Sequence, residues 1–377
     1  MKLNSFLRVL FGLFLELGFY GALTLEDEFP ISELNTYFES FFAKKNSTDY
    51  ETWLDSLPKQ EELDEMRQLL AKVYRMETFK DVDNSLLDQY TALKDYLNVT
   101  VIQGHYCVIH EQIPQDSDRF RRMWGYVVIA SKNWARRMIH HSASHFASDG
   151  PVCSQAAALF ERTRSRSLVV AGADRFAVKG DKRSECQEQF QIADASHNCR
   201  TMFHFVNTVL KDLAEEDVQS SWKEDYHFFV QWHGMAETSC VHSDAFISTG
   251  IKNSSIYERS IPATKIMESF NRIAADLGMK VNATTPLQDQ ECTLTAGTNI
   301  FGRYINGVPR ESVCNVTAKE EDITGKFVHI EQKRAIRENI SLWTSVIQDA
   351  FPDRNGDSYS KSTALVMAFA VLCSFVF

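Results

Sequence analysis

The feature that most constrains the fold is the alternation of short apolar runs with longer amphipathic stretches after residue 100. Runs rich in Val, Ile, Phe and Tyr occupy 106–109, 126–130, 167–171, 227–231, 245–248 and 327–330. Stretches with helical spacing lie between several of them, at 154–163, 197–215, 263–277 and 334–351. Strands alternating with helices predict an α/β domain with a mostly parallel sheet and helices on both faces. We place this domain at residues 101–352.

The segment before this domain is acidic and has a different pattern. Residues 23–100 hold 17 acidic and 8 basic side chains, so they carry nearly all of the chain's net charge of −10. Apolar residues recur at helical spacing at Leu63, Met66, Leu69, Leu70 and Val73. We therefore expect an N-terminal helical extension of two to four helices. The acidic balance argues against nucleic acid as a partner, because such proteins need a basic surface.

Both ends of the chain are hydrophobic. Residues 1–22 combine Lys2 and Arg8 with an apolar run, which is typical of a secretory signal peptide. Residues 363–377 are uncharged and follow the small residues at 355–358 and a polar spacer, the order of a GPI-attachment signal. We assign this signal to residues 353–377 and expect a glycoprotein held by lipid on the outer face of the plasma membrane. A single-pass anchor without a cytoplasmic end is the alternative.

Glycosylation sequons agree with export. The pattern Asn-x-Ser/Thr occurs at six positions: Asn46, Asn98, Asn253, Asn282, Asn315 and Asn339. Each sequon that is used must lie on the surface of the folded chain.

The cysteines indicate a globular domain with a few disulfide bonds. Of the eight cysteines, Cys373 lies in the hydrophobic tail, which leaves an odd number in the domain. At least one of these is free or pairs with another molecule. We expect the local pairs Cys186–Cys199 and Cys292–Cys314, although sequence alone does not fix connectivity.

Polar residues cluster at the ends of the predicted strands, where ligands bind in open α/β sheets. His145 and Asp149 precede one helix, and His197 opens another. The remaining residues of this kind are Asp174, Arg175, His233 and Glu331. Histidines and carboxylates from separate strand ends can bind zinc and activate water. Six further histidines have no place at a strand end and are interpreted as structural: His140, His141, His204, His227, His242 and His329.

Other hydrolase chemistries have weaker support. The chain has no Gly-x-Ser-x-Gly nucleophile elbow. Cys153 could act as a nucleophile with His197 as its base, but nothing in the sequence orients the pair. A histidine phosphatase would need an arginine directly before His233-Gly234, and none is present.

Several segments resemble zinc amidohydrolases of the N-formylglutamate amidohydrolase and N-acetylmuramoyl-alanine amidase type, over about residues 105–350. They are His145-x3-Asp149, 168–175, 193–198, 231–234, 299–309 and 327–332. The resemblance implies that His145 and His233 are zinc ligands. It also implies that Glu331 is the catalytic carboxylate and that His197 is a catalytic residue lining the substrate site, where Arg175 and Asp174 bind the substrate.

One difference from that family pattern affects the functional prediction. The pattern has a glutamate, its middle zinc ligand, about nine residues after the first histidine, and Ser154 stands there instead. Cys153 or Asp149 would have to take its place. Asp174 also stands where the pattern tends to have histidine. We therefore expect a degenerate domain that binds an extracellular ligand. The alternative is an active zinc-dependent amidohydrolase that cleaves the amide bond of an acylated amino acid or peptide.

Overall fold

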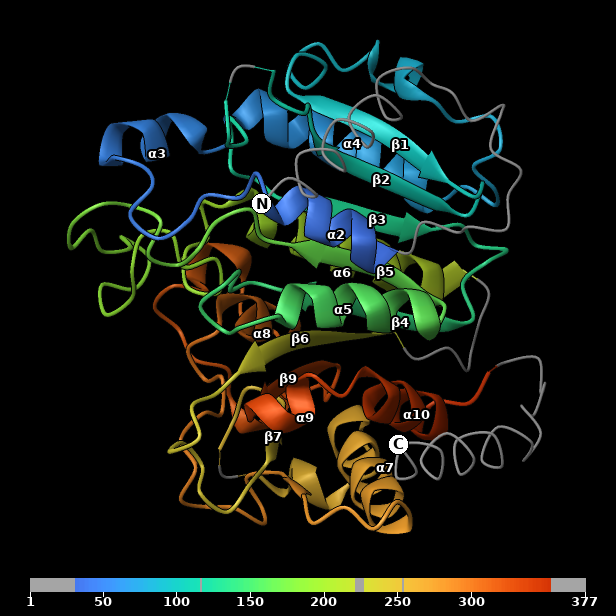
Figure 1. Cartoon of the computed structure of the whole chain (residues 1–377), viewed down its shortest axis with the longest axis vertical. Helices are drawn as coiled ribbons and strands as arrows, with labels where there is room; N and C mark the ends of the chain where they lie inside the picture. Colours follow the sequence, from blue (N-terminus) through green and yellow to red (C-terminus); the bar gives the residue numbers. More distant parts are fainter. Residues whose placement is uncertain (1–30, 116, 221–226, 253, 354–377) are drawn as a thin grey trace, which may run out of the picture.

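The computed structural model describes residues 31–115, 117–220, 227–252 and 254–353, which build a nine-stranded sheet with helices (Figure 1). The strand order is β1-β2-β3-β5-β4-β6-β9-β7-β8. The strands are β1 (Leu97–Ile102), β2 (Tyr106–Glu111), β3 (Tyr126–Ala130), β4 (Arg137–Ala143), β5 (Ser165–Val170), β6 (Phe228–Gly234), β7 (Ala245–Ser248), β8 (Ala283–Thr284) and β9 (Phe327–Gln332). The α/β class is therefore confirmed.

The prediction of a mostly parallel sheet is wrong, because the sheet is mixed. Strands β5, β4, β6 and β9 form a parallel centre. Antiparallel pairing joins β1 to β2, β2 to β3 and β3 to β5. Strand β7 is also antiparallel to β9. The physical reason is the length of the connections. Only three residues join β1 to β2, and such a short link allows only an antiparallel pair.

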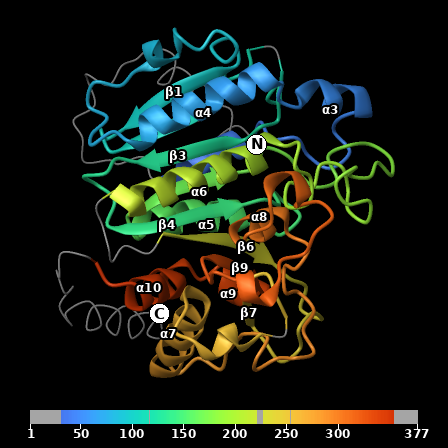
Figure 2. The ribbon, with the colours of Figure 1, turned by 180° about the vertical axis from the view of Figure 1, so that it is seen from behind.

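Helices cover both faces of the sheet, as Figures 1 and 2 show from opposite sides. The α-helices are α2 (Ile31–Glu39), α3 (Tyr50–Ser56), α4 (Gln60–Tyr74), α5 (Val152–Arg162), α6 (Met202–Ser220), α7 (Pro262–Asp276), α8 (Ile300–Ile305), α9 (Arg334–Arg337) and α10 (Ile340–Ala350). Short 3-10 turns are η1 (Asn84–Leu87), η2 (Ser255–Glu258), η3 (Arg310–Ser312) and η4 (Glu320–Asp322). One apolar core lies under α2, α5, α7 and α10, and another under α4 and α6.

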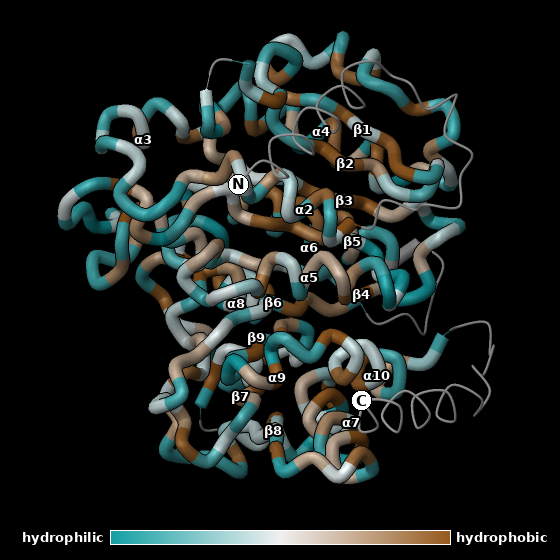
Figure 3. The backbone as a smooth tube through the Cα atoms, in the orientation of Figure 1, coloured by the Kyte–Doolittle hydropathy of each residue, from teal (hydrophilic) through white to brown (hydrophobic). Residues whose placement is uncertain are grey.

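The apolar strands lie at the centre of the molecule and the polar loops at its edge (Figure 3). The acidic N-terminal segment takes part in this packing. Phe38 of α2 is fully buried in the core with α5, and Leu70 of α4 is fully buried in the core with α6. This segment therefore contributes to the cores on both faces of the sheet.

Several elements differ from the expectations, including strands β1 and β8, which were not predicted. Strand β4 was not predicted because its sequence, RMIHHSA, is polar, yet it is a central strand and mostly buried. Helix α6 begins at Met202, so His197 lies in the loop before it. The expected helix over 334–351 is divided into α9 and α10. Asn339 caps α10, since its side chain accepts a hydrogen bond from the Leu342 amide at 3.0 Å.

The disulfide pairing also differs from the expectation. The bonds are Cys186–Cys314 and Cys240–Cys292, with sequence separations of 128 and 52. The expected pairs Cys186–Cys199 and Cys292–Cys314 are therefore wrong. The fold decides the pairing, because it brings the loop after β5 against the segment after α8.

Features of the surface bear on export. Asn46, Asn282 and Asn315 are exposed, and Asn98 and Asn339 are half-buried. The described residues contain no helix that is long and apolar enough to cross a membrane. The predicted signal peptide, the predicted GPI-attachment signal after Asp353 and the Asn253 sequon lie outside the described residues.

Candidate functional site

The candidate site lies at the carboxyl ends of the four central parallel strands. His145 follows β4, Arg175 follows β5, and His233 and Glu331 lie at the ends of β6 and β9. His233 and Glu331 are register partners in the β6–β9 ladder. Parallel strands end at the same edge of the sheet, which is why residues far apart in sequence meet here.

A tight turn between β4 and α5 brings Asp149 to the same place. The Asp149 amide donates to the His145 carbonyl at 3.3 Å, and Gly150 has a φ of +69°. The turn packs directly on the end of β6, where a Cβ at Gly234 would lie 2.5 Å from the Asp149 carbonyl oxygen. Glycine at 234 therefore allows this approach, and its amide donates to Asp149 Oδ2 at 3.3 Å.

Three potential ligand atoms form a small triangle. His145 Nδ1 lies 3.1 Å from His233 Nδ1, and Asp149 Oδ2 lies 3.0 Å from the first and 3.1 Å from the second. All three residues are buried. Zinc–ligand bonds of about 2.0–2.1 Å place adjacent ligands of a tetrahedral ion about 3.3 Å apart. The triangle therefore has nearly the size of one face of a zinc tetrahedron.

The opposite nitrogen of each histidine contacts an acceptor. His145 Nε2 lies 3.0 Å from Asp194 Oδ1, and His233 Nε2 lies 2.9 Å from Gln231 Oε1. A proton on each Nε2 satisfies these contacts and leaves each Nδ1 lone pair directed at the triangle. Acceptors of this kind fix the ring tautomer of metal-binding histidines. Gln231 is itself held by Ser196 and Asn299, which donate to the same oxygen at 3.1 Å and 2.5 Å.

The site is strongly charged. Burial and Arg175 both lower the pKa of His145, but Asp194 and Asp149 outweigh them and raise it to about 9. Burial by itself would raise the pKa values of Asp149 and Asp194. The charge and hydrogen bonds of His145 and its neighbours instead hold them well below their usual range. In the metal-free protein, the two carboxylates therefore favour the protonated form of His145, whereas binding of a metal ion requires its Nδ1 to be free of the proton. Burial lowers the pKa of His233 to about 4, so that ring is neutral.

Arg175 contacts the same triangle. Its Nη2 lies 2.5 Å from His145 Nδ1 and donates a short hydrogen bond to Asp149 Oδ1. Its side chain remains 25% exposed, so it can withdraw toward solvent. In this structure, Arg175, which was expected to contact the substrate, is bound to a carboxylate of the protein.

Glu331 lies beside the triangle together with His329. One carboxylate oxygen of Glu331 is within 4.8 Å of one ring nitrogen of His233 and one of His329. Glu331 Oε1 is 3.6 Å from His329 Nε2. Burial, followed by the charge of Asp149, raises the pKa of Glu331 to about 8. Burial and then His233 lower the pKa of His329 well below its usual range, so His329 is neutral.

His197 occupies the neighbouring position around Asp194. Its Nδ1 lies 2.9 Å from Asp194 Oδ1, and its Nε2 lies 3.3 Å from Thr298 Oγ1. Its ring stacks on Phe190 with centroids 3.4 Å apart. His197 therefore contacts the triangle through Asp194.

The structure places the other candidate residues elsewhere. The Asp174 carboxylate accepts a hydrogen bond from the Phe176 amide at 2.7 Å, which is a local turn contact. Ser154 Oγ accepts a hydrogen bond from Asn35 Nδ2 at 3.0 Å on α2. Cys153 is buried in the core beneath α5. Of the two residues considered as a substitute for the missing glutamate, Asp149 is the one that joins the histidines.

Sequence reasoning assigned no functional role to Asp194 or Gln231, and it interpreted His329 as structural. Asp194 and Gln231 stand three and two residues before histidines that were assigned roles. His329 and Glu331 are two residues apart on β9, and side chains two residues apart in a strand point to the same face of the sheet. The strand alternation was thus a usable signal for His329.

Two comparisons with known proteins bear on this site. A scan against protein-family models found no family that matches the chain. A search of curated proteins likewise found no match.

Proposed function

We propose that the domain is a zinc-dependent amidohydrolase, with zinc held by His145, Asp149 and His233. One observation carries this proposal: two imidazole nitrogens and a carboxylate oxygen lie 3.0–3.1 Å from one another. Imidazole and carboxylate are ligands that zinc favours, and three protein ligands are typical of catalytic zinc sites. The site also has the outer acceptors Asp194 and Gln231 that such histidines need.

The protein's own residues supply the rest of the chemistry. When bound, zinc would polarise an amide carbonyl and lower the pKa of water. In its ionised form, Glu331 would accept a proton from the attacking water on its carboxylate and donate it to the leaving nitrogen. Asp194 holds the His145 ring in position from the opposite side. Arg175, once it leaves the triangle, can bind a substrate carboxylate with two parallel hydrogen bonds, which fits an acylated amino acid or peptide.

A second candidate function rests on the position of Arg175. Its guanidinium contacts His145 and Asp149, so it already brings positive charge to the place that zinc would occupy. If Arg175 stays there, the domain is a degenerate enzyme that binds an extracellular ligand. The two functions differ in whether zinc displaces this arginine.

Zinc titration of the purified, chelator-treated protein distinguishes the two functions. We expect one zinc ion per chain in wild type, and loss of binding in both Asp149→Ala and His233→Ala. The exposed histidine variant His242→Ala is the control and should bind zinc like wild type. Absence of stoichiometric zinc in folded wild type would overturn the hydrolase proposal and favour the binding function.

Turnover provides the second measurement. With N-acylated amino acids as substrates, Glu331→Gln should retain zinc and lower kcat by about 10²–10⁴-fold, the usual contribution of a general acid–base. Zinc-loaded wild type with no hydrolysis across acyl-amino-acid and peptide amides would contradict the assigned activity while leaving the metal site intact.

The proposed place of action is the outer face of the cell, tethered by lipid. Two disulfide bonds and three exposed sequon asparagines support export. Phosphatidylinositol-specific phospholipase should release the protein from intact cells, and N-glycanase should lower its apparent mass. Retention on the cells together with an intact C-terminal peptide would rule out the lipid anchor.

A further inference from the structure

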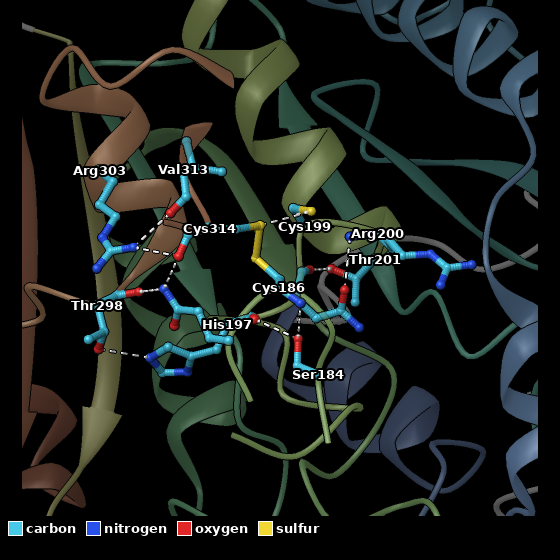
Figure 4. The surroundings of a disulfide bond; sticks show 12 residues. Ser184, Cys186, His197, Cys199, Arg200, Thr201, Thr298, Arg303, Val313 and Cys314 are labelled. Atoms are coloured by element: carbon cyan, nitrogen blue, oxygen red, sulfur yellow. Dashed lines mark hydrogen bonds between the residues drawn. A yellow bond between two sulfur atoms is a disulfide. The ribbon is translucent and has the colours of Figure 1, made fainter. Parts of the chain in front are cut away.

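A third cysteine lies against one of the two disulfide bonds. Cys199 has a free thiol, and its Sγ is 3.4 Å from Sγ of Cys314, which is bonded to Cys186 (Figure 4). The three sulfur atoms lie within 4.8 Å of one another. We propose that Cys186, Cys199 and Cys314 form a thiol–disulfide exchange site, in which Cys199 displaces Cys186 from Cys314.

The exchange is chemically balanced within the chain. Cys199 loses its proton to solvent, and its thiolate attacks Cys314 Sγ. The Cys199–Cys314 bond forms as the Cys314–Cys186 bond breaks, and the Cys186 thiolate that leaves takes up a proton. One disulfide and one thiol exist before and after the step, so no external oxidant or reductant is needed.

The surroundings hold Cys314 in place. Arg303 Nη1 donates to the carbonyl oxygens of Val313 and Cys314, at 2.9 Å each. Gln187 Nε2 donates to the Thr298 carbonyl at 2.9 Å and to the Cys314 carbonyl at 3.4 Å. Cys186 and Cys199, in contrast, both belong to the long loop between β5 and α6. The exchange therefore changes which residue of that loop is tied to Cys314.

Cys199 is reachable from solvent, whereas Cys186 is buried. Cys199 is half-buried and lines a groove of about 480 Å³ together with Leu63, Arg67, Arg200, Phe205 and Arg310. Exchange thus moves the free thiol from a solvent-facing groove to a buried position. Burial raises the pKa of the Cys199 thiol, and Arg200 opposes this only in part. The exchange rate is proportional to the thiolate fraction. While the pH is below that pKa, the rate should therefore rise about tenfold for each unit by which the pH is increased.

The exchange site is connected to the candidate zinc site. Ser184 Oγ accepts from the Cys186 amide at 3.2 Å and donates to the His197 carbonyl at 3.0 Å. His197 lies two residues before Cys199 and contacts Asp194, the acceptor behind His145. Before exchange, Cys314 is bonded to Cys186, which precedes His197 in the loop. After exchange, Cys314 is bonded to Cys199, which follows His197.

Disulfide mapping of the full folded protein tests the proposal. Protein is incubated at pH 8.5, quenched with acid, and digested with pepsin at acidic pH, which prevents exchange during digestion. We expect two linked peptides by mass spectrometry, Cys186–Cys314 and Cys199–Cys314. The Cys240–Cys292 bond is the internal control, since no free cysteine of the described chain shares a sulfur cluster with it. A Cys199–Cys314 signal no higher than the mispairing of Cys240 and Cys292 would overturn the proposal.

Two variants provide an independent measurement. In Cys186→Ser incubated with oxidised glutathione as the oxidant, Cys199 should form a disulfide with Cys314, while Cys199→Ser should retain the Cys186–Cys314 bond. Free or glutathionylated thiols at both Cys199 and Cys314 in folded Cys186→Ser after that treatment would also overturn the proposal. If Cys186→Ser does not fold, the mapping of wild type decides the question, because it needs no substitution.

Discussion

The Nδ1 atoms of His145 and His233 lie 3.1 Å apart, although 88 positions separate the two residues in the chain. Each ring is fixed from behind, by Asp194 and Gln231 respectively. Two ring nitrogens at this distance repel each other unless a proton, a guanidinium or a metal ion lies between them. This relationship is the basis of the predictions for the site.

The acceptor behind His145 should tune metal affinity. Asp194→Asn removes the carboxylate that contacts His145 Nε2 while keeping the size of the side chain. Substitutions of such outer acceptors usually weaken metal binding by about 10–100-fold, and we expect a loss of that size in the zinc Kd. The measurement is zinc titration with a competing chelator, and a thermal melt checks that the variant folds. An unchanged Kd would mean that His145 does not bind the ion.

Removal of the Arg175 guanidinium should strengthen zinc binding. The Arg175→Met variant keeps the length of the side chain and removes the charge that contacts His145 and Asp149. Because the guanidinium and zinc compete for these atoms, zinc should bind more tightly to the variant than to wild type. Arg183→Met, which removes an exposed arginine paired with Asp181, is the matched control. Weaker zinc binding in Arg175→Met would show that the arginine supports the metal site instead.

A carboxylate at position 154 should not improve the metal site. Ser154 Oγ contacts Asn35 Nδ2, which also donates to Glu39 Oε1 at 2.7 Å. In Ser154→Glu, the new charge would lie near Glu39, whose pKa burial already raises. We expect unchanged zinc affinity and a lower melting temperature, measured on the same preparations. A tighter zinc Kd in this variant would show that residue 154 reaches the ion and that Asp149 is not the third ligand.

A buried ion pair should stabilise the N-terminal segment. Arg122 donates to both carboxylate oxygens of Glu62, at 2.6 Å and 2.8 Å, and both side chains are about 5% exposed or less. Arg122→Leu leaves Glu62 buried without its partner, which should lower the free energy of unfolding by about 3–5 kcal/mol. The exposed pair Arg75–Glu216 is the control, and Arg75→Leu should cost at most about 1 kcal/mol. Equal losses in denaturant unfolding of the two variants would contradict the assignment.

Stability should depend on pH through Glu111. This buried carboxylate accepts hydrogen bonds from the amides of Arg122 and Trp124, and burial raises its pKa from 4.5 to about 7. A raised folded-state pKa means that the folded protein holds the proton between pH 4.5 and about 7 while the unfolded chain releases it. The stabilisation is therefore present below pH 4.5 and is lost as pH rises through about 7.

The matching experiment compares wild type with Glu111→Gln, which cannot titrate. The difference in free energy of unfolding between the two should shift by about 3 kcal/mol against wild type from pH 4.5 to 7. Subtraction removes the contributions of other groups, including the buried histidines. A constant difference across this range would mean that Glu111 has the same pKa in the folded and unfolded states.

The sequence by itself determined the local patterns. Apolar runs and helical spacing gave most helices and strands of the domain, since burial of one face requires those periods. The strand-end argument also selected seven residues. Six of them lie in or next to the candidate site: His145, Asp149, Arg175, His197, His233 and Glu331. The seventh, Asp174, makes a local turn contact instead. Residues at the ends of parallel strands share an edge of the sheet, so their convergence could be expected before any coordinates.

Only the tertiary structure decided the relations between distant segments. Three of these relations depend on which loops pack together. They are the strand directions at the sheet edges, the pairing of Cys186 with Cys314, and the contact of Asp149, in place of Ser154, with the two histidines. Strand β4 was missed because His140 and His141 read as polar. The fold makes them core residues, since they contact Ser167 and Ser165 on the neighbouring strand β5 at 2.7 Å and 2.9 Å. A buried polar side chain is satisfied by a partner far away in the chain, and local sequence does not specify that partner.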